Sequence, residues 1–239
     1  EPLGLGAPFL WVAGWGVDLM LAIGSWTASL PGAVRTIPSA PDFVLPIAFL
    51  GVIFICLWRG RLRWLGLPLA AAVLVWPRAP APDLWIGEGG TNAAFSRQGE
   101  AVVLRPGVRT FAVDLWSRRR GLALTEREAD GWSCDRFSCG PDDAAAGPVA
   151  LWWGRRAPDV ERLAALCRTA AVIGVRPVVT ELPSACAGRL VLDGVDFARG
   201  GAVELWRDGQ GWRAVWTTEV RGRRPWTRRT DPEVSDSGA

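Results

Sequence analysis

Histidine, lysine and tyrosine are absent from the 239 residues of this chain, and methionine occurs once, at Met20. Without an imidazole to activate Ser133, Ser138 or any other hydroxyl, a Ser-His-Asp hydrolase is excluded. The same absence removes the ligands with which hydrolytic zinc sites usually hold their metal. All 27 basic side chains are arginines, a pattern that we interpret as a biased genome composition. Because the chain begins at Glu1 rather than at methionine, we expect a fragment or a processed product.

Charged residues are scarce over residues 1–82, which hold only three acids and five arginines. Residues 83–239 hold 22 arginines and 21 acids, so their charges nearly balance. Neither part has the large excess of positive charge that is typical of proteins that bind nucleic acid. The mean hydropathy of +0.16 lies on the apolar side for a soluble protein. Its uneven distribution predicts a membrane-embedded part followed by a soluble part.

Three apolar stretches fill the first part, at residues 8–30, 43–58 and 62–76. A helix needs about 20 apolar residues to cross a bilayer, and the first stretch, interrupted only by Asp18, reaches that length. The third reaches it only if the arginines at its start extend to the membrane surface. Tryptophans lie near the ends of the stretches, where indole rings favour the headgroup region: Trp11, Trp26, Trp58, Trp64 and Trp76. A helix that lies flat on the membrane, or is buried in a protein core, remains the alternative for each stretch.

The densest basic loop of the first part, Arg59–Arg63, lies between the second and third stretches. Arginine-rich loops favour the cytoplasmic side, so this turn is predicted to be cytoplasmic. A third helix would then leave the membrane on the opposite side, and residues 83–239 are expected in the periplasm.

Four cysteines lie in the soluble part: Cys134, Cys139, Cys167 and Cys186. An even number is typical of disulfides in an oxidising compartment, and we predict the pairs Cys134–Cys139 and Cys167–Cys186. A four-thiolate zinc site is disfavoured, because 18 residues separate the last two cysteines and the usual spacing is two to four. Cys167 also fits a simple buried thiol on an apolar helix face. Cys56 lies alone in an apolar stretch and is interpreted as facing lipid or another helix.

The soluble part follows a proline-rich connector at residues 77–82. Short apolar runs between glycine-rich turns predict strands, among them residues 178–181. The clearest helix has Pro158 at its first position and one apolar face at helical spacing. Alternating strands and helices predict an α/β domain, so the fold class is a membrane α-helical segment followed by an α/β domain. The expected domains are 1–82, 83–218 and a disordered tail, 219–239.

Several segments together resemble one protein family. The membrane part contributes Pro2–Leu5, Asp18–Leu21, Leu30–Ala33 and Leu62–Leu67, and the soluble part contributes Trp132–Asp135, Cys139, Cys167, Pro183, Cys186, Asp193, Gly200–Leu205 and Arg224–Trp226. In this order and combination they resemble the C-terminal part of the ComEC competence family. Members of that family form the inner-membrane channel that imports single-stranded DNA in natural transformation.

The resemblance implies that residues 83–218 form a degenerate metallo-β-lactamase-like αββα sandwich. In many relatives this domain is proposed to degrade the DNA strand that is not imported, and that reaction needs a histidine-rich metal cluster. Such a cluster is missing here, so we expect a catalytically silent domain, with no catalytic residue, no metal site and no cofactor. The alternative is a membrane-anchored extracytoplasmic nuclease or hydrolase whose metal site is built without histidine.

Three further features have two interpretations each. Asp18 is an intramembrane polar candidate, or it lies on the wet side of an interfacial helix. The run Gly87–Gly90, where the family has a glycine-rich first turn, is a phosphate-binding turn or, as we favour, a plain turn. Arg118–Arg120 and Arg221–Arg229 contact phosphates or, as we favour, form solvated surface. No DNA-binding residue is assigned.

The resemblance also implies partners and a location. We expect single-stranded DNA, through the full-length channel, and membrane lipid as partners. Other competence proteins and further copies of the chain are additional candidates. The expected location is the bacterial inner membrane, with the C-terminal domain in the periplasm.

Overall fold

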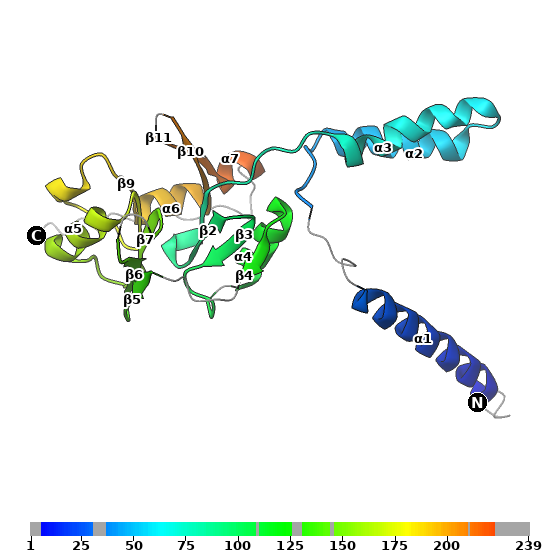
Figure 1. Ribbon diagram of the computed structural model, residues 1–239, viewed down its shortest axis with the longest axis horizontal. Coiled ribbons are helices and arrows are strands. Elements are labelled where there is room, and N and C mark those ends of the chain that lie inside the picture. The colour runs from blue at the N-terminus through cyan, green and yellow to red at the C-terminus, as the bar shows by residue number, and fades with distance from the viewer. Residues whose placement is uncertain are drawn as a thin grey trace, which may run out of the picture. The chain divides into compact units, whose positions relative to one another are not determined.

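The computed structural model describes residues 6–30, 37–108, 110–125, 131–143, 146–209 and 211–222 (Figure 1). The described chain falls into two compact units, one up to Leu30 and one from Ile37 onward. The second unit contains both the later apolar helices and the α/β domain. The division predicted at residue 82 therefore falls inside the second unit.

The first unit is a single apolar helix, α1 (Gly6–Ser29). At 1.5 Å per residue its 24 residues extend about 36 Å. Its segment Phe9–Ser29 is, among the described residues, the one helix long and apolar enough to cross a membrane. Asp18 lies near the middle of α1 and is exposed on the helix surface. The first of the three predicted membrane segments is thus a helix of spanning length.

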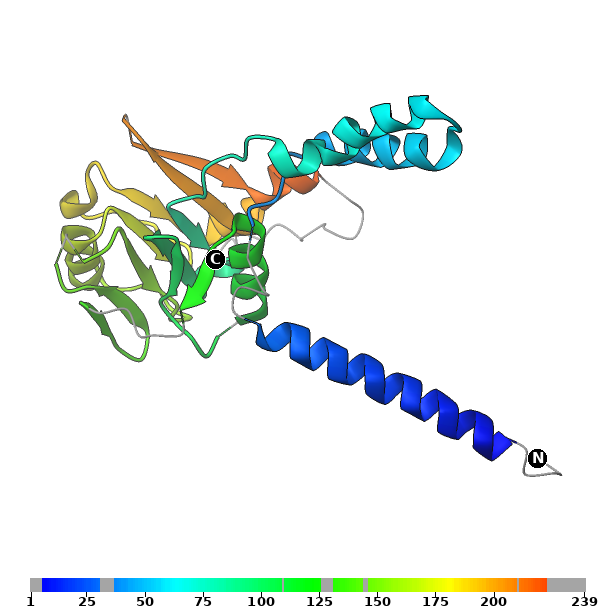
Figure 2. The same cartoon turned by 45° about the vertical axis from the view of Figure 1, so that its right-hand side comes forward.

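The second and third apolar stretches form a helical hairpin. The first arm is α2 (Val44–Leu57), and the second arm begins as a short 3₁₀ helix, η1 (Arg61–Leu65), and continues as α3 (Gly66–Val75). The two arms lie side by side in both views (Figures 1 and 2). From the rise per residue, the first arm is about 21 Å long and the second about 25 Å, both shorter than a bilayer core of about 30 Å.

Two glycines let the arms of the hairpin approach closely. A Cβ atom on Gly51 would lie 2.7 Å from the carbonyl oxygen of Gly66, and one on Gly66 would lie 2.5 Å from the carbonyl oxygen of Gly51. Aromatic rings flank the hairpin at its base, where Phe43 meets Trp76 edge to face with centroids 5.2 Å apart. Small residues at a helix contact are typical of membrane helix pairs.

Both legs of the hairpin are tied to the α/β domain. Arg78 donates from Nε to the carbonyl of Pro38 (2.8 Å) and from Nη2 to that of Val73 (3.0 Å), which satisfies a free carbonyl at the end of α3. The amide of Ser39 donates to the carbonyl of Arg119 (2.9 Å). Gly121 has a φ of +71°, and a Cβ there would lie 2.6 Å from Cγ of Pro38.

The α/β domain contains two sheets. The first has the strand order β11-β10-β1-β2-β3-β4 and the second the order β5-β6-β7-β8-β9. The strands are β1 (Leu84–Ile86), β2 (Ala93–Arg97), β3 (Glu100–Val103), β4 (Ala123–Thr125), β5 (Trp132–Cys134), β6 (Ser138–Pro141), β7 (Val149–Trp152), β8 (Val172–Val175), β9 (Leu190–Leu192), β10 (Val203–Asp208) and β11 (Gly211–Trp216). Pairing is parallel between β3 and β4 and along β7-β8-β9, and antiparallel elsewhere.

Three apolar clusters order the domain into four layers. The central cluster lies between the sheets and includes Leu84, Leu151 and Phe197. A second cluster packs α4 (Thr110–Arg120) against the outer face of the first sheet, with Trp85 stacked on Trp116. A third packs α5 (Val160–Thr169) against the outer face of the second sheet. The order is therefore helix, sheet, sheet, helix, which confirms the predicted α/β class.

Two local predictions are wrong. Residues 178–181 form no strand, because the amide of Val179 donates to Oδ2 of Asp193 (3.0 Å) instead of to a sheet neighbour. This segment belongs to the crossover that parallel strands β8 and β9 require. Pro158 precedes α5 rather than beginning it, because the Asp159 side chain accepts from the amide of Arg162 (2.7 Å) and caps the helix one residue later.

Two further helices lie toward the end of the domain. The first is α6 (Gly194–Gly200), which begins with a reciprocal capping box between Asp193 and Asp196. The second, α7 (Thr217–Arg221), includes the first residues of the predicted tail, so the tail does not begin at Glu219. The rest of that tail, from residue 223, lies outside the described residues.

Candidate functional site

The strand order brings three separate segments to one edge of the second sheet. Strands β7 and β8 are parallel, so Trp153 and Arg176, which follow them, lie at the same edge. Strand β6 is antiparallel to β7 and pairs Ser138 with Trp152, so the turn that precedes β6 reaches this edge too. The carboxyl ends of parallel strands are the usual place of ligand sites in α/β sheets.

A pocket of about 610 Å³ lies at this edge. Its lining consists of four arginines, three aromatic residues and a glycine: Arg136, Phe137, Trp152, Trp153, Gly154, Arg155, Arg156 and Arg176. We call it the arginine–tryptophan pocket. All four arginines are exposed. None of them forms an ion pair with a carboxylate of the described residues, so no described carboxylate neutralises the four positive charges that line the pocket.

A fifth arginine, which follows β3 of the first sheet, contacts Trp153 of the pocket. The guanidinium of Arg105 lies over the indole ring of Trp153, 3.9 Å from the ring centroid, and donates from Nη1 to the carbonyl of Thr91 (2.7 Å). Burial, and secondarily the charge of Arg176, lowers the pKa of Arg105 below its ordinary value. The charges of Arg105 and Arg176 are therefore close enough to interact.

The two tryptophans are fixed by hydrogen bonds to the loops that carry the arginines. The Nε1 atom of Trp152 donates to the carbonyl of Arg156 (2.9 Å), and that of Trp153 donates to the carbonyl of Arg136 (3.0 Å). The ring of Phe137 lies beside that of Trp152, with centroids 6.2 Å apart. Phe137 remains 46% exposed, so one edge of the pocket offers an accessible aromatic ring.

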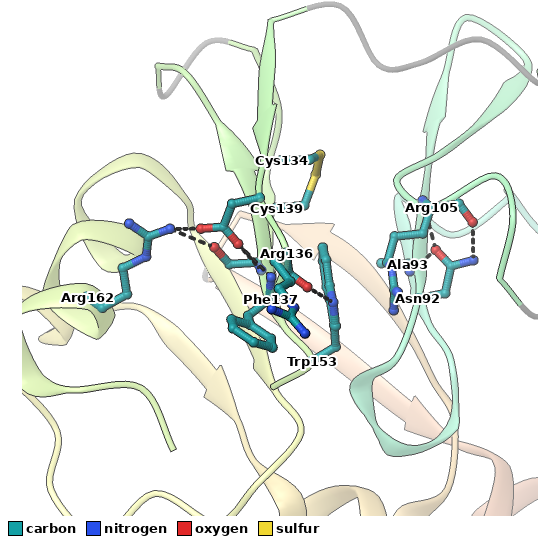
Figure 3. Close-up of a disulfide and its surroundings, with 11 residues drawn as sticks. Asn92, Ala93, Arg105, Cys134, Arg136, Phe137, Cys139, Trp153 and Arg162 are labelled. Carbon is teal, nitrogen blue, oxygen red and sulfur yellow. Dashed lines mark hydrogen bonds and ion pairs between the residues drawn. A yellow bond between two sulfur atoms is a disulfide. The ribbon is translucent and has the colours of Figure 1, made fainter. Parts of the chain in front are cut away.

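The turn that carries Arg136 and Phe137 is held at both ends (Figure 3). The Asp135 carboxylate accepts from the amides of Phe137 (2.7 Å) and Ser138 (2.6 Å) and forms an ion pair with Arg162 of α5. The sulfurs of Cys134 and Cys139 lie at disulfide distance across the turn. The backbone that carries Phe137 and Arg136 is therefore positioned before any ligand arrives.

A buried asparagine side chain holds the backbone at Arg105 in place. Asn92 is fully buried, and its Oδ1 accepts from the amides of Ala93 (2.9 Å) and Arg105 (3.2 Å). Its Nδ2 donates to the carbonyls of Arg105 (3.1 Å) and Val108 (2.6 Å). All the hydrogen-bonding capacity of this side chain is thus used to fix the backbone on which Arg105 stands.

The four predicted disulfide cysteines lie in two pairs at disulfide distance, Cys134 with Cys139 and Cys167 with Cys186. The second pair joins α5 to the short helix η3 (Ser184–Cys186) in the crossover between β8 and β9. Both of its cysteines are buried, away from the arginine–tryptophan pocket. Cys56 is an exposed free thiol on α2.

The glycine-rich run Gly87–Gly90 forms a turn that contains the short helix η2 (Glu88–Gly90). The amide of Gly87 donates to the carbonyl of Asn92 (2.9 Å) and that of Gly90 to the carbonyl of Gly87 (3.0 Å). Gly90 has a φ of +60°, and a Cβ there would lie 3.0 Å from the ring of Phe197. Turn geometry and packing therefore account for glycine at this position, and these two amides are not available to a phosphate.

The arginine run at the end of α4 is engaged within the protein. Arg118 pairs with Asp114 (2.9 Å) at the helix surface, and Arg120 pairs with Glu204 of β10. Arg119 is exposed. In the second predicted run only Arg221, at the end of α7, is described, and the residues from 223 to 229 lie outside the described part of the chain.

The sequence reasoning missed the arginine–tryptophan pocket. Its signal was the run Trp152-Trp153-Gly154-Arg155-Arg156, which follows a buried strand and combines aromatic and basic residues. The pocket offers guanidinium groups and aromatic faces, which bind anions and planar rings. Within the described residues, no three Asp, Glu or Cys side chains gather in a way that could hold a metal ion.

Comparison with known proteins concerns the other end of the chain. Residues 2–62, which include α1, α2 and the arginine turn up to Leu62, match the family model described as competence protein. Over these residues the chain is similar to that family. The match confirms the resemblance to ComEC-type proteins and supports a role in DNA uptake. No curated protein and no solved structure matches the chain. The family match ends before the α/β domain, so the pocket has to be interpreted from its own chemistry.

Proposed function

We propose that the chain is part of an inner-membrane channel that imports single-stranded DNA in natural transformation, with a catalytically silent C-terminal domain in the periplasm. The competence-family match over residues 2–62 is the observation that carries this proposal. The spanning helix Phe9–Ser29 and the arginine-tipped hairpin are the membrane elements expected of such a component. Membrane lipid, other competence proteins and further copies of the chain are its proposed partners.

The silent C-terminal domain is proposed to descend from a metallo-β-lactamase-like enzyme. The layer order helix, sheet, sheet, helix supports this relationship. An enzyme of that kind makes hydroxide at a metal held largely by imidazoles. The absence of histidine from all 239 residues supports the loss of this chemistry. What remains is a folded domain with a preformed cationic pocket, which suits binding better than hydrolysis.

The test of the channel role uses the intact gene in a naturally transformable bacterium that carries it. Deleting the gene should abolish the appearance of labelled DNA in the cytoplasm, while double-stranded DNA bound outside the inner membrane remains. Reintroducing the intact gene should restore import. Normal import in the deletion strain would overturn the proposal.

The alternative, a nuclease with a metal site built without histidine, makes a different prediction. The purified full chain in detergent should not cleave single- or double-stranded DNA with Zn²⁺, Mn²⁺ or Mg²⁺. Cleavage that is lost on chelation, and lost again when single Asp or Glu residues are replaced, would establish the alternative instead.

A further inference from the structure

We propose that the arginine–tryptophan pocket is a binding site for single-stranded nucleic acid, with phosphates held by the arginines and a base stacked on Phe137. The choice of DNA over RNA as the physiological strand rests on the proposed function. The pocket itself is argued from the residues that line it.

The charge of the pocket selects an anionic ligand. Four exposed guanidiniums line it, and a fifth, that of Arg105, lies over the ring of Trp153 and interacts with the charge of Arg176. Like charges placed this close repel one another, so an anion that enters between them is stabilised by all of them. A guanidinium binds a phosphate by two parallel hydrogen bonds, which makes phosphate the anion that arginines recognise best.

The aromatic lining reduces the number of anionic ligand classes that fit the pocket. An inorganic phosphate or a lipid headgroup needs only the arginines. Phe137, Trp152 and Trp153 add ring surfaces next to those charges, and Phe137 keeps nearly half of its surface exposed. Proteins that bind single strands without strong sequence preference combine a cationic groove with aromatic side chains on which bases stack. A duplex hides its bases from such rings, so the single strand fits both features.

The pocket is also built in advance. Hydrogen bonds from both indoles fix the loops of Arg136 and Arg156, and Asp135 with the Cys134–Cys139 pair fixes the turn of Phe137. A volume of about 610 Å³ lies within the usual range for small-molecule sites, about 300–1,000 Å³. Binding therefore needs little ordering of the backbone and of the two indoles, which would otherwise oppose it.

The experiment measures binding of a fluorescently labelled oligothymidylate of about 12 nucleotides to the full chain in detergent, by anisotropy at several salt concentrations. The double variant Arg155→Gln/Arg156→Gln should weaken binding and lower the slope of log K against log salt by about 1.4 if both arginines contact phosphates. The matched control, Arg118→Gln/Arg119→Gln, removes two adjacent exposed arginines from α4 and should leave affinity and slope unchanged.

A second variant tests stacking. Phe137→Leu keeps an apolar side chain but removes the ring, and it should weaken binding of the single strand about tenfold without changing the salt slope. A duplex of equal length should bind more weakly and be insensitive to this change. Thermal unfolding midpoints equal to that of the wild type establish that the variants fold. If Phe137→Leu is unfolded, the arginine pair alone decides the outcome.

Three results would overturn the proposal. One is equal affinity of wild type and the Arg155/Arg156 variant. Another is equal binding of duplex and single strand with no effect of Phe137→Leu. The third is complete displacement of the strand by short-chain phosphatidylglycerol or inorganic phosphate at concentrations comparable to the oligonucleotide. None of these results bears on the gene-deletion assay. The proposed binding site and the proposed channel role are therefore tested independently of each other.

Discussion

Arg105 and Trp153 join the two sheets of the α/β domain through a cation–π contact, with the guanidinium 3.9 Å from the centroid of the indole ring. Arg105 follows β3 of the first sheet, and Trp153 follows β7 of the second. Neither strand pairs with the other, so this contact is made by side chains alone. The same indole lines the arginine–tryptophan pocket. The stability of the interface between the sheets and the shape of the pocket therefore depend on the same ring.

Replacing Asn92 should destabilise the backbone that carries Arg105 and thereby the contact of Arg105 with Trp153. Asn92→Ala removes the acceptor of the Ala93 and Arg105 amides and the donor to the Val108 carbonyl, whereas the Arg105 carbonyl keeps the amide of Val108 as a partner. Each unsatisfied buried group costs about 1–3 kcal/mol, so we expect the free energy of unfolding to fall by about 3 kcal/mol or more. Denaturant unfolding of the full chain in detergent, followed by tryptophan fluorescence, measures the loss. The exposed Thr180→Ala serves as control and should cost less than about 0.5 kcal/mol. An equal effect of both changes would contradict the role assigned to Asn92.

The close approach of Gly51 and Gly66 predicts that a side chain there separates the hairpin arms. Gly51→Val should destabilise the hairpin by about 1–3 kcal/mol, because the added carbons overlap the backbone of the second arm. With cysteines at positions 43 and 76 and Cys56→Ser, a short bis-maleimide should link the base efficiently in the parent and several-fold less in the variant. Gly24→Val is the control, because a Cβ at Gly24 meets no atom within 4 Å. Unchanged linking in Gly51→Val would show that the arms do not need glycine.

The two cysteine pairs are predicted to be oxidised disulfides in the purified protein. Mass mapping of unreduced digests should find Cys134 linked to Cys139 and Cys167 to Cys186. By chain entropy, the sequence separations of 5 and 19 residues correspond to about 2 and about 3 kcal/mol of stabilisation. Cys167→Ser/Cys186→Ser should therefore lower stability more than Cys134→Ser/Cys139→Ser. Four free thiols, or a zinc ion bound to them, would refute the pairing.

Membrane topology can be tested with paired reporters. A phosphatase that is active only outside the cytoplasm, fused after Gly222, should give signal, whereas a fluorescent protein that matures only in the cytoplasm should stay dark there. The same reporters fused after Gly60, in the arginine turn, should give the opposite pattern. Cytoplasmic signal after Gly222 would reverse the proposed orientation and remove the argument for disulfides.

Local patterns predicted several elements of the fold closely. The apolar stretches predicted at residues 8–30 and 43–58 form α1 and α2, and the predicted helix with one apolar face is α5. Such elements are decided by neighbours in sequence. The segment at 178–181 failed because its partner, Asp193, is distant in sequence and belongs to a helix cap that the pattern did not reveal.

The pocket escaped sequence reasoning for a related reason. Its residues come from three segments that only the pairing order β6-β7-β8 brings together. Near-balanced charge over residues 83–239 suggested no basic surface, yet the fold gathers four arginines at one edge of the second sheet. Overall charge is a poor guide to the charge of a single cavity.

The contacts of Pro38 with Arg78 and with Gly121 restrict how the hairpin can move relative to the domain. The hairpin of α2 and α3 joins the domain through two legs, one continuous with β1 and the other held by Ser39 and Pro38 against the end of α4. One connection would let the hairpin rotate freely, whereas two connections restrict its rotation to the axis that passes through both. A tilt of the hairpin relative to the domain would therefore act on the end of α4 through Ser39 and Pro38.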